Sequence, residues 1–143
     1  RMEFMDQDTY KSELAKTRNI DDIIKSHGGI ERIKDLRKRV VSYQGNRCPF
    51  LGTWKTHNHH ILSFARYPEY GDDPLNCIIL DVRIHGYITW VGSYHYISFF
   101  FAFLDRTYGT THHDYPKPVA PQRDLLQDIQ GVNIDDFYHG TLA

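Results

Sequence analysis

The sequence predicts an α+β fold, a single domain over residues 1–143 in which amino-terminal helices and short carboxy-terminal helices pack on an antiparallel sheet of four or five strands. A chain of 143 residues is long enough to bury one hydrophobic core without disulfide or metal support. Residues 1–43 have the apolar spacing of helices, whereas residues 44–110 are short β-branched and aromatic runs between turn residues. Residues 111–143 form a proline-rich linker followed by short helical segments.

Two helices are predicted after an earlier, less regular one over residues 8–16. Asn19 is a good N-cap residue, and the pair of glycines at residues 28 and 29 ends the helix that we expect over residues 20–27. Apolar residues recur at helical spacing over residues 30–41, so one side of this second helix should face the core. Its arginines suit a helix-turn-helix, but interleaved acidic residues and a net charge of −1 argue against nucleic acid as a partner.

Strand-forming residues fill the middle of the chain. The strands are expected in five runs, which read FLGTW, HILSFARY, NCIILDVRI, GYITWVG and HYISFFFAFLD. Apolar residues alternate in the third run, which predicts one face in the core and the other partly in water. The last run is apolar on both faces, so we expect it to be a central strand.

The two ends of the chain differ in charge. Residues 1–47 carry eleven Lys and Arg against eight Asp and Glu, and residues 114–143 carry two against five. Such asymmetry suits a homo-oligomer, or a protein partner with a charged face. The two cysteines show no CxxC pattern, no run is long and apolar enough for a membrane span, and no signal peptide is recognised. We therefore expect a cytoplasmic protein with no membrane partner.

Seven of the nine histidines lie within residues 57–113. Residues two apart on an extended strand point to the same side, so His57 and His59 could present two nitrogens to a metal ion, with His85 and His112 completing the set. The asparagine between the first two favours a turn, however, and none of the established spacings of zinc enzymes is present. We therefore expect no cofactor and keep zinc or manganese, bound by these four histidines, as an alternative.

The β-rich segment also carries the groups that suit a small phosphorylated nucleotide. Arginines can bind phosphates, aromatic rings can stack on bases, and imidazoles can donate hydrogen bonds to phosphates or base edges. Two arginine–tyrosine pairs open loops that follow predicted strands, where binding residues concentrate. The expected ligand-binding residues are His59, Arg66, Tyr67, Arg83, His85, Trp90, Arg106 and Tyr108.

One stretch, LDVRIHGYITW, carries a motif in which an acidic strand is followed by His-Gly, an aliphatic residue, threonine and an aromatic ring. The matching residues are His85, Gly86, Ile88, Thr89 and Trp90. The stretch resembles a set of small uncharacterised phage and prophage proteins, although Tyr87 replaces their second glycine. The resemblance implies a phage accessory protein and supplies no catalytic residues, because the set has no assigned function.

Small phage proteins of this kind often counter host defence. The leading hypothesis is therefore a phage protein that sequesters a small, possibly cyclic, nucleotide signal in the host cytoplasm without catalysis. Two alternatives stay open. One is a metal-assisted phosphodiesterase or hydrolase that uses the histidine cluster. The other is a protein inhibitor that binds a host defence protein directly, through its acidic tail or its basic helix.

Overall fold

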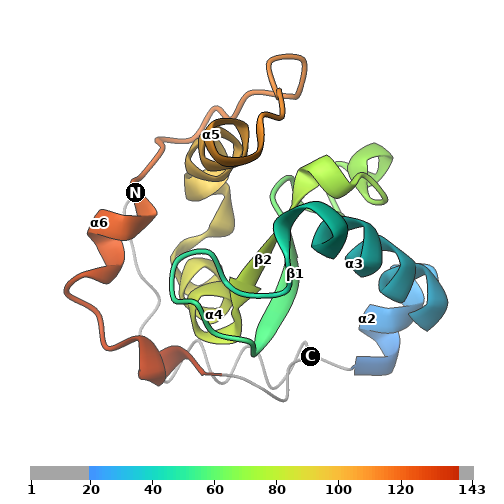
Figure 1. Ribbon diagram of the computed structural model, residues 1–143, viewed down its shortest axis with the longest axis horizontal. Helices are drawn as coiled ribbons and strands as arrows, with labels where there is room; N and C mark the ends of the chain where they lie inside the picture. The colour runs from blue at the N-terminus through green and yellow to red at the C-terminus, as the bar shows by residue number, and fades with distance from the viewer. Residues whose placement is uncertain (1–19, 139–143) are drawn as a thin grey trace.

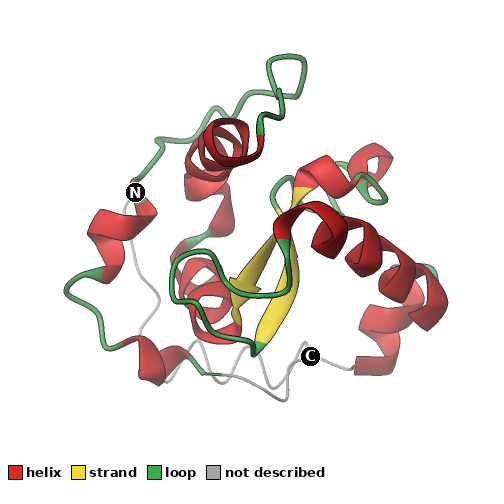
Figure 2. Cartoon of the chain, in the orientation of Figure 1, coloured by secondary structure: helices red, strands yellow, loops and turns green. Residues whose placement is uncertain are grey.

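The computed structural model describes residues 20–138, and the helix predicted over residues 8–16 lies outside them. Within the described part, helices surround a small antiparallel sheet (Figure 1 and Figure 2). The fold is α+β, but the prediction of four or five strands is wrong, because the described residues form a sheet of two strands. No helix in residues 20–138 is long and apolar enough to cross a membrane.

The described part of the chain begins with two helices, α2 (Ile20–Ser26) and α3 (Ile30–Gln44). Gly28 and Gly29 separate them with φ angles of 87° and 98°, a left-handed conformation that other residues adopt at a steric cost. The α3 side chains that are buried face the sheet, where they pack against β2. This arrangement agrees with the predicted amphipathic helix.

The two strands are β1 (Thr56–His60) and β2 (Cys77–Asp81). They pair antiparallel, and His59 lies opposite Ile78. The other edge of β2 is occupied by the Gln44 amide at the end of α3. Its Nε2 donates to the carbonyl of Cys77 at 2.7 Å, and its Oε1 accepts from the Ile79 amide at 3.0 Å. A side chain thus satisfies the backbone groups that a third strand would otherwise pair.

The last two predicted strands are helices. The chain turns at Asp81 into α4 (Val82–Val91), passes a 3-10 turn η3 (Ser93–Tyr96), and continues as α5 (Ile97–Tyr108). The buried residues of α5 recur at helical spacing and comprise Ile97, Phe100, Phe101 and Leu104. Their aromatic and β-branched side chains favour strands only weakly, and packing around the sheet overrides that preference.

The first predicted strand is also wrong, because FLGTW forms a turn. The amide of Gly52 donates to the carbonyl of Cys48 at 2.8 Å, and the amide of Cys48 donates to the carbonyl of Thr53 at 2.9 Å. The second predicted run is a strand only at its first residue, His60, after which the chain bends away. The remaining short elements are η1 (Pro68–Tyr70), η2 (Pro74–Asn76), α6 (Leu125–Ile129) and η4 (Ile134–Phe137).

The sheet has a hydrophobic core on each face. The larger core joins α4 and α5 to one face and contains Ile78, Leu80 and many aromatic rings. The smaller core joins α3 to the other face, where Cys77 and Ile79 meet Leu36 and Val40. Both faces of β2 are therefore buried, which explains why its five residues are all inaccessible to water.

Asn76 is the buried polar residue that extends the strand pairing beyond β1. Its Oδ1 accepts from the Leu62 amide at 2.8 Å, and its Nδ2 donates to the Leu62 carbonyl at 3.0 Å. We expect Asn76→Ala to lower the free energy of unfolding by about 2 kcal/mol, because both backbone groups lose a buried partner. Urea denaturation measures this loss. The exposed Asn46→Ala is the control and should change stability by less than about 0.5 kcal/mol.

Candidate functional site

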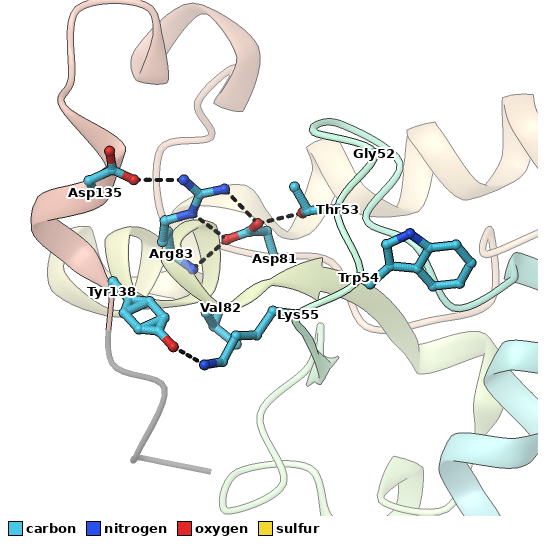
Figure 3. Close-up of a pocket in the computed structure, with 9 residues that line it drawn as sticks. All are labelled: Gly52, Thr53, Trp54, Lys55, Asp81, Val82, Arg83, Asp135 and Tyr138. Carbon is cyan, nitrogen blue, oxygen red and sulfur yellow. Dashed lines mark hydrogen bonds and ion pairs between the residues drawn. The ribbon is translucent and has the colours of Figure 1, made fainter.

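A groove of about 710 Å³ opens where β2 passes into α4. We call it the α4 groove. Its lining comprises residues 52–55, residues 81–83, Asp135 and Tyr138. Figure 3 shows the segment before β1 on one side, the segment around η4 on the other, and the Asp81–Arg83 pair between them. This volume lies within the usual range for sites that bind small molecules.

Asp81 holds the floor of the groove in place. It is only 1% exposed, and its Oδ1 caps α4 by accepting from the Arg83 amide at 2.8 Å. The Arg83 guanidinium donates to both carboxylate oxygens at 2.9 Å, and the Thr53 hydroxyl donates to Oδ2 at 2.5 Å. Burial by itself would raise the pKa of Asp81, but these hydrogen bonds outweigh burial and lower it below its ordinary value.

Arg83 connects this floor to the opposite wall. Its Nη1 donates to Oδ1 of Asp135 at 2.7 Å, and the Asp135 side chain is 73% exposed. The two carboxylates raise the pKa of Arg83, so the guanidinium stays charged at any physiological pH. The Asp81 contact is buried and bidentate, whereas the Asp135 contact is a single bond to a solvated group. Another anion can replace Asp135 at much lower cost than Asp81.

Lys55 provides a second cation. Its ammonium donates to the hydroxyl of Tyr138 and lies 4.6 Å from the centre of that ring. Within residues 20–138, no carboxylate forms an ion pair with Lys55. Trp54 lies at the other rim (Figure 3) and is 59% exposed. The Arg47 guanidinium lies 4.1 Å from the centre of its ring. The groove thus combines two cations with two exposed aromatic rings.

A cluster of imidazoles lies where β1 packs on α4. His57 and His59 come from alternate positions of β1, and His85 comes from the beginning of α4. The Nδ1 atoms of His57 and His85 lie 2.9 Å apart, and the rings of His59 and His85 are 5.0 Å apart. The turn expected at Asn58 does not occur, because this residue pairs with Ile79 within the strand. The two β1 imidazoles therefore share one side of the sheet.

His112 does not join this cluster. Its Nδ1 lies 2.5 Å from Oδ1 of Asp105, its Nε2 lies 2.6 Å from the carbonyl of Leu75, and its ring stacks on Phe101. The four histidines of the alternative metal site are thus divided between two places. In the described part of the chain, no group of three or more His, Cys, Asp or Glu side chains is placed to hold a metal ion.

Of the eight predicted ligand residues, Arg83 lines the α4 groove, and His59 and His85 lie in the imidazole cluster. The other five are distributed over the rest of the fold. Arg66 lies 6.0 Å from the ring of Tyr67, its neighbour in sequence, in the segment that follows β1. The strands that were expected to hold these residues side by side are absent from residues 20–138.

Three of these five belong to the helices α4 and α5. Trp90 packs against Phe137, with ring centres 5.0 Å apart. Tyr108 meets Tyr43 edge to face at 5.6 Å, and Arg106 is exposed in the last turn of α5. As far as residues 20–138 define it, the lining of the α4 groove contains none of these three residues.

Sequence reasoning missed Trp54, Lys55, Asp135 and Tyr138 as groove residues. Trp54 and Lys55 belong to a run that was expected to be a strand and its turn, and the other two lie far away in the sequence. One signal was present at Asp81, which precedes a helix as an N-cap residue would. Because aspartate is a favoured N-cap residue, Asp81 could have indicated that the strand ends there and a helix begins at Val82.

We compared the chain with known proteins. No protein-family model matches the sequence, and neither curated proteins nor solved structures give a significant match. The functional argument therefore depends on the geometry of the α4 groove and the imidazole cluster.

Proposed function

We propose that the protein binds a small phosphorylated nucleotide in the α4 groove and does not convert it. The observation that carries the proposal is that Lys55, Arg83 and two exposed aromatic residues, Trp54 and Tyr138, line one groove. Cations bind phosphate oxygens, and aromatic rings stack on bases whatever their sequence. These are the two recognition modes that a nucleotide requires.

The phosphate is expected to take the place of the Asp135 carboxylate. Arg83 keeps its buried bidentate contact with Asp81 and offers Nη1 to the ligand, while Lys55 offers an ammonium whose present partner is a neutral hydroxyl. The lining contains two cations and two carboxylates, so its net charge is zero while Asp135 remains in place. Moving Asp135 away leaves a net charge of +1, which favours an anionic ligand.

The hydrogen bonds of Asp81 support binding rather than catalysis. A general base needs a free carboxylate oxygen near the reacting group. Both oxygens of Asp81 already accept from Arg83, and Oδ2 also accepts from Thr53. The other carboxylate of the lining, Asp135, is largely exposed to water and accepts from Arg83 through Oδ1.

The resemblance to phage proteins supplies the biological setting of this proposal. A phage protein that binds a nucleotide signal tightly would lower the free concentration of that signal in the host cytoplasm. Sequestration requires that the protein bind the signal tightly and be abundant, and it requires no catalysis. A groove lined by cations and aromatic side chains can supply such binding. The ligand is then a host nucleotide, linear or cyclic.

The proposal predicts opposite effects of two substitutions in the groove. Lys55→Ala should weaken nucleotide binding by about tenfold or more, because one phosphate contact is lost. Asp135→Asn should strengthen binding several-fold, because the carboxylate that competes for Arg83 loses its charge. Calorimetry with linear and cyclic mono- and dinucleotides, at low ionic strength, measures both changes.

Lys34→Ala is the matched control, since Lys34 is an exposed lysine of α3 away from the groove lining. It should bind like the unchanged protein. Native mass spectrometry of the same samples counts bound nucleotides and subunits together. If none of the nucleotides binds, or if Lys55→Ala and Lys34→Ala bind equally well, the proposal is wrong.

A further inference from the structure

We propose that His57, His59 and His85 form an acid-sensitive joint between β1 and α4, which is closed while the imidazoles are neutral and opens when they take up protons. The joint is a property of the folded chain, and it does not depend on the nucleotide proposed above. Its basis is the hydrogen bond between the rings of His57 and His85, and the burial of the His57 and His59 Nε2 atoms without an acceptor in residues 20–138.

The His57–His85 contact accommodates one proton between its two nitrogens. Two nitrogens 2.9 Å apart share a hydrogen bond when one ring donates N–H and the other accepts with a bare nitrogen. Two imidazolium rings would place one N–H directly against the other. The contact must therefore separate before both rings are charged.

Protonation is also unfavourable at the Nε2 atoms of the two β1 imidazoles. The Nε2 atoms of His57 and His59 are buried, and neither has a hydrogen-bond partner in residues 20–138. His59 is 5% exposed, and the ring of Phe100 on α5 lies 5.5 Å from its ring. An added N–H at either atom would be a buried charge without an acceptor, which is costly.

Among residues 20–138, charged and titratable groups reach the cluster from three elements. The cation of Arg37 on α3 disfavours a charged His57, whereas Asp81 at the end of β2 favours one. From β1 itself, His60 adds a further imidazole beside His59. Burial, followed by the Arg37 cation, lowers the pKa of His57, and burial with the neighbouring imidazoles lowers the pKa of His59 well below its ordinary value.

These lowered pKa values determine the direction of the pH effect. In the unfolded chain the imidazoles titrate near pH 6.5. As the pH falls below that value, the imidazoles of the unfolded or opened chain bind protons, whereas those of the closed cluster stay neutral. Acid therefore favours the opened state, and stability is retained above about pH 6.5.

Opening the joint would also disturb the α4 groove. His57 follows Lys55 by two positions, and His85 follows Arg83 by two positions in the first turns of α4. The amide of Val82 donates to the carbonyl of Lys55 at 3.1 Å and joins the same two segments. Separation of α4 from β1 would move the two groove cations apart.

Urea denaturation of the ligand-free protein across pH tests the joint. Between about pH 6.5 and pH 5, we expect the unfolding constant of the unchanged protein to rise more steeply than that of His57→Gln, by about tenfold per pH unit. Glutamine keeps an amide that can hydrogen-bond His85 but takes up no proton. His113→Gln is the control, because this side chain is 73% exposed, and it should keep the full pH dependence.

Nitrogen-15 spectra of the histidine rings provide a second measurement on the unchanged protein, independent of whether the variant folds. His57 and His59 should take up protons together, at a pH below the ordinary imidazole value of 6.5. Separate titration of these two rings near pH 6.5 would overturn the proposal, as would equal pH dependence of the unchanged protein and His57→Gln. A pH profile that shifts on adding EDTA would also overturn it, since a bound metal would then hold the imidazoles.

Discussion

Replacing Arg83 with methionine is expected to lower the free energy of unfolding by about 3 kcal/mol, because it leaves the buried carboxylate of Asp81 without its cation. The Asp81 side chain is 2% exposed and receives two hydrogen bonds from the Arg83 guanidinium. Methionine retains much of the apolar stem and removes the charge. Urea denaturation near neutral pH measures the loss.

The control for Arg83→Met is Asp135→Asn, which breaks the other ion pair of the same guanidinium. Asp135 is largely exposed, so this change should cost less than about 1 kcal/mol. Adding Asp81→Asn to Arg83→Met should recover part of the lost stability, because an amide can be buried without a cation. If Arg83→Met and Asp135→Asn lower the free energy of unfolding equally, the buried Asp81–Arg83 pair contributes no more to stability than the exposed pair, and the prediction is wrong.

The carboxylate of Asp81 also makes the stability of the protein depend on pH in acid. The pKa of Asp81 is lowered in the folded state, so its contribution to stability is present above the ordinary carboxylate pKa of 3.8 and disappears as the pH falls through the lower folded value. The imidazoles of the unfolded chain begin to take up protons near pH 6.5, so the imidazole effect begins at a higher pH than this loss. The two effects can therefore be separated in one pH series.

Phe100→Ala is expected to cost about 4 kcal/mol, the largest loss among the substitutions considered. The ring is fully buried in α5, and it packs against Phe50, Tyr96 and His59. Alanine leaves a cavity that these rings cannot fill without moving. Thermal or urea denaturation followed by circular dichroism measures the change.

Ala102→Ser is the matched control for Phe100→Ala. On a strand, residues two apart point to the same side, so Ala102 would share the buried position of Phe100. On α5 Ala102 is exposed, and serine there should change stability by less than about 0.5 kcal/mol. A large loss of stability in Ala102→Ser would contradict the helical conformation of this segment.

The amino-terminal helices could be predicted because local signals and tertiary structure agree there. The helix expected over residues 20–27 is α2, which ends at Ser26 before the two glycines. The helix expected over residues 30–41 is α3, which extends three residues further to Gln44. The extra turn brings the Gln44 amide to β2, a contact between residues more than thirty positions apart that no local pattern specifies.

The error over α4 and α5 has a specific cause. The segment ISFFFAFL is apolar at almost every position, so it fits a buried strand and a buried helix equally well. Its burial follows the helical spacing of Ile97, Phe100 and Leu104, while Ser98 and Ala102 remain exposed. The small and polar residues at these two positions were the available evidence for a helix.

The sequence by itself determined where the chain is apolar, where it turns and where a helix can start, because glycines, prolines and capping residues act within a few positions. Only the tertiary structure decided that the apolar runs after Asp81 are helices, since packing on both faces of β2 outweighs their weak preference for strands. It also decided the candidate site. Lys55, Arg83 and Tyr138 are distant in the chain, and a groove forms only when the β2–α4 junction and the segment after η4 lie together.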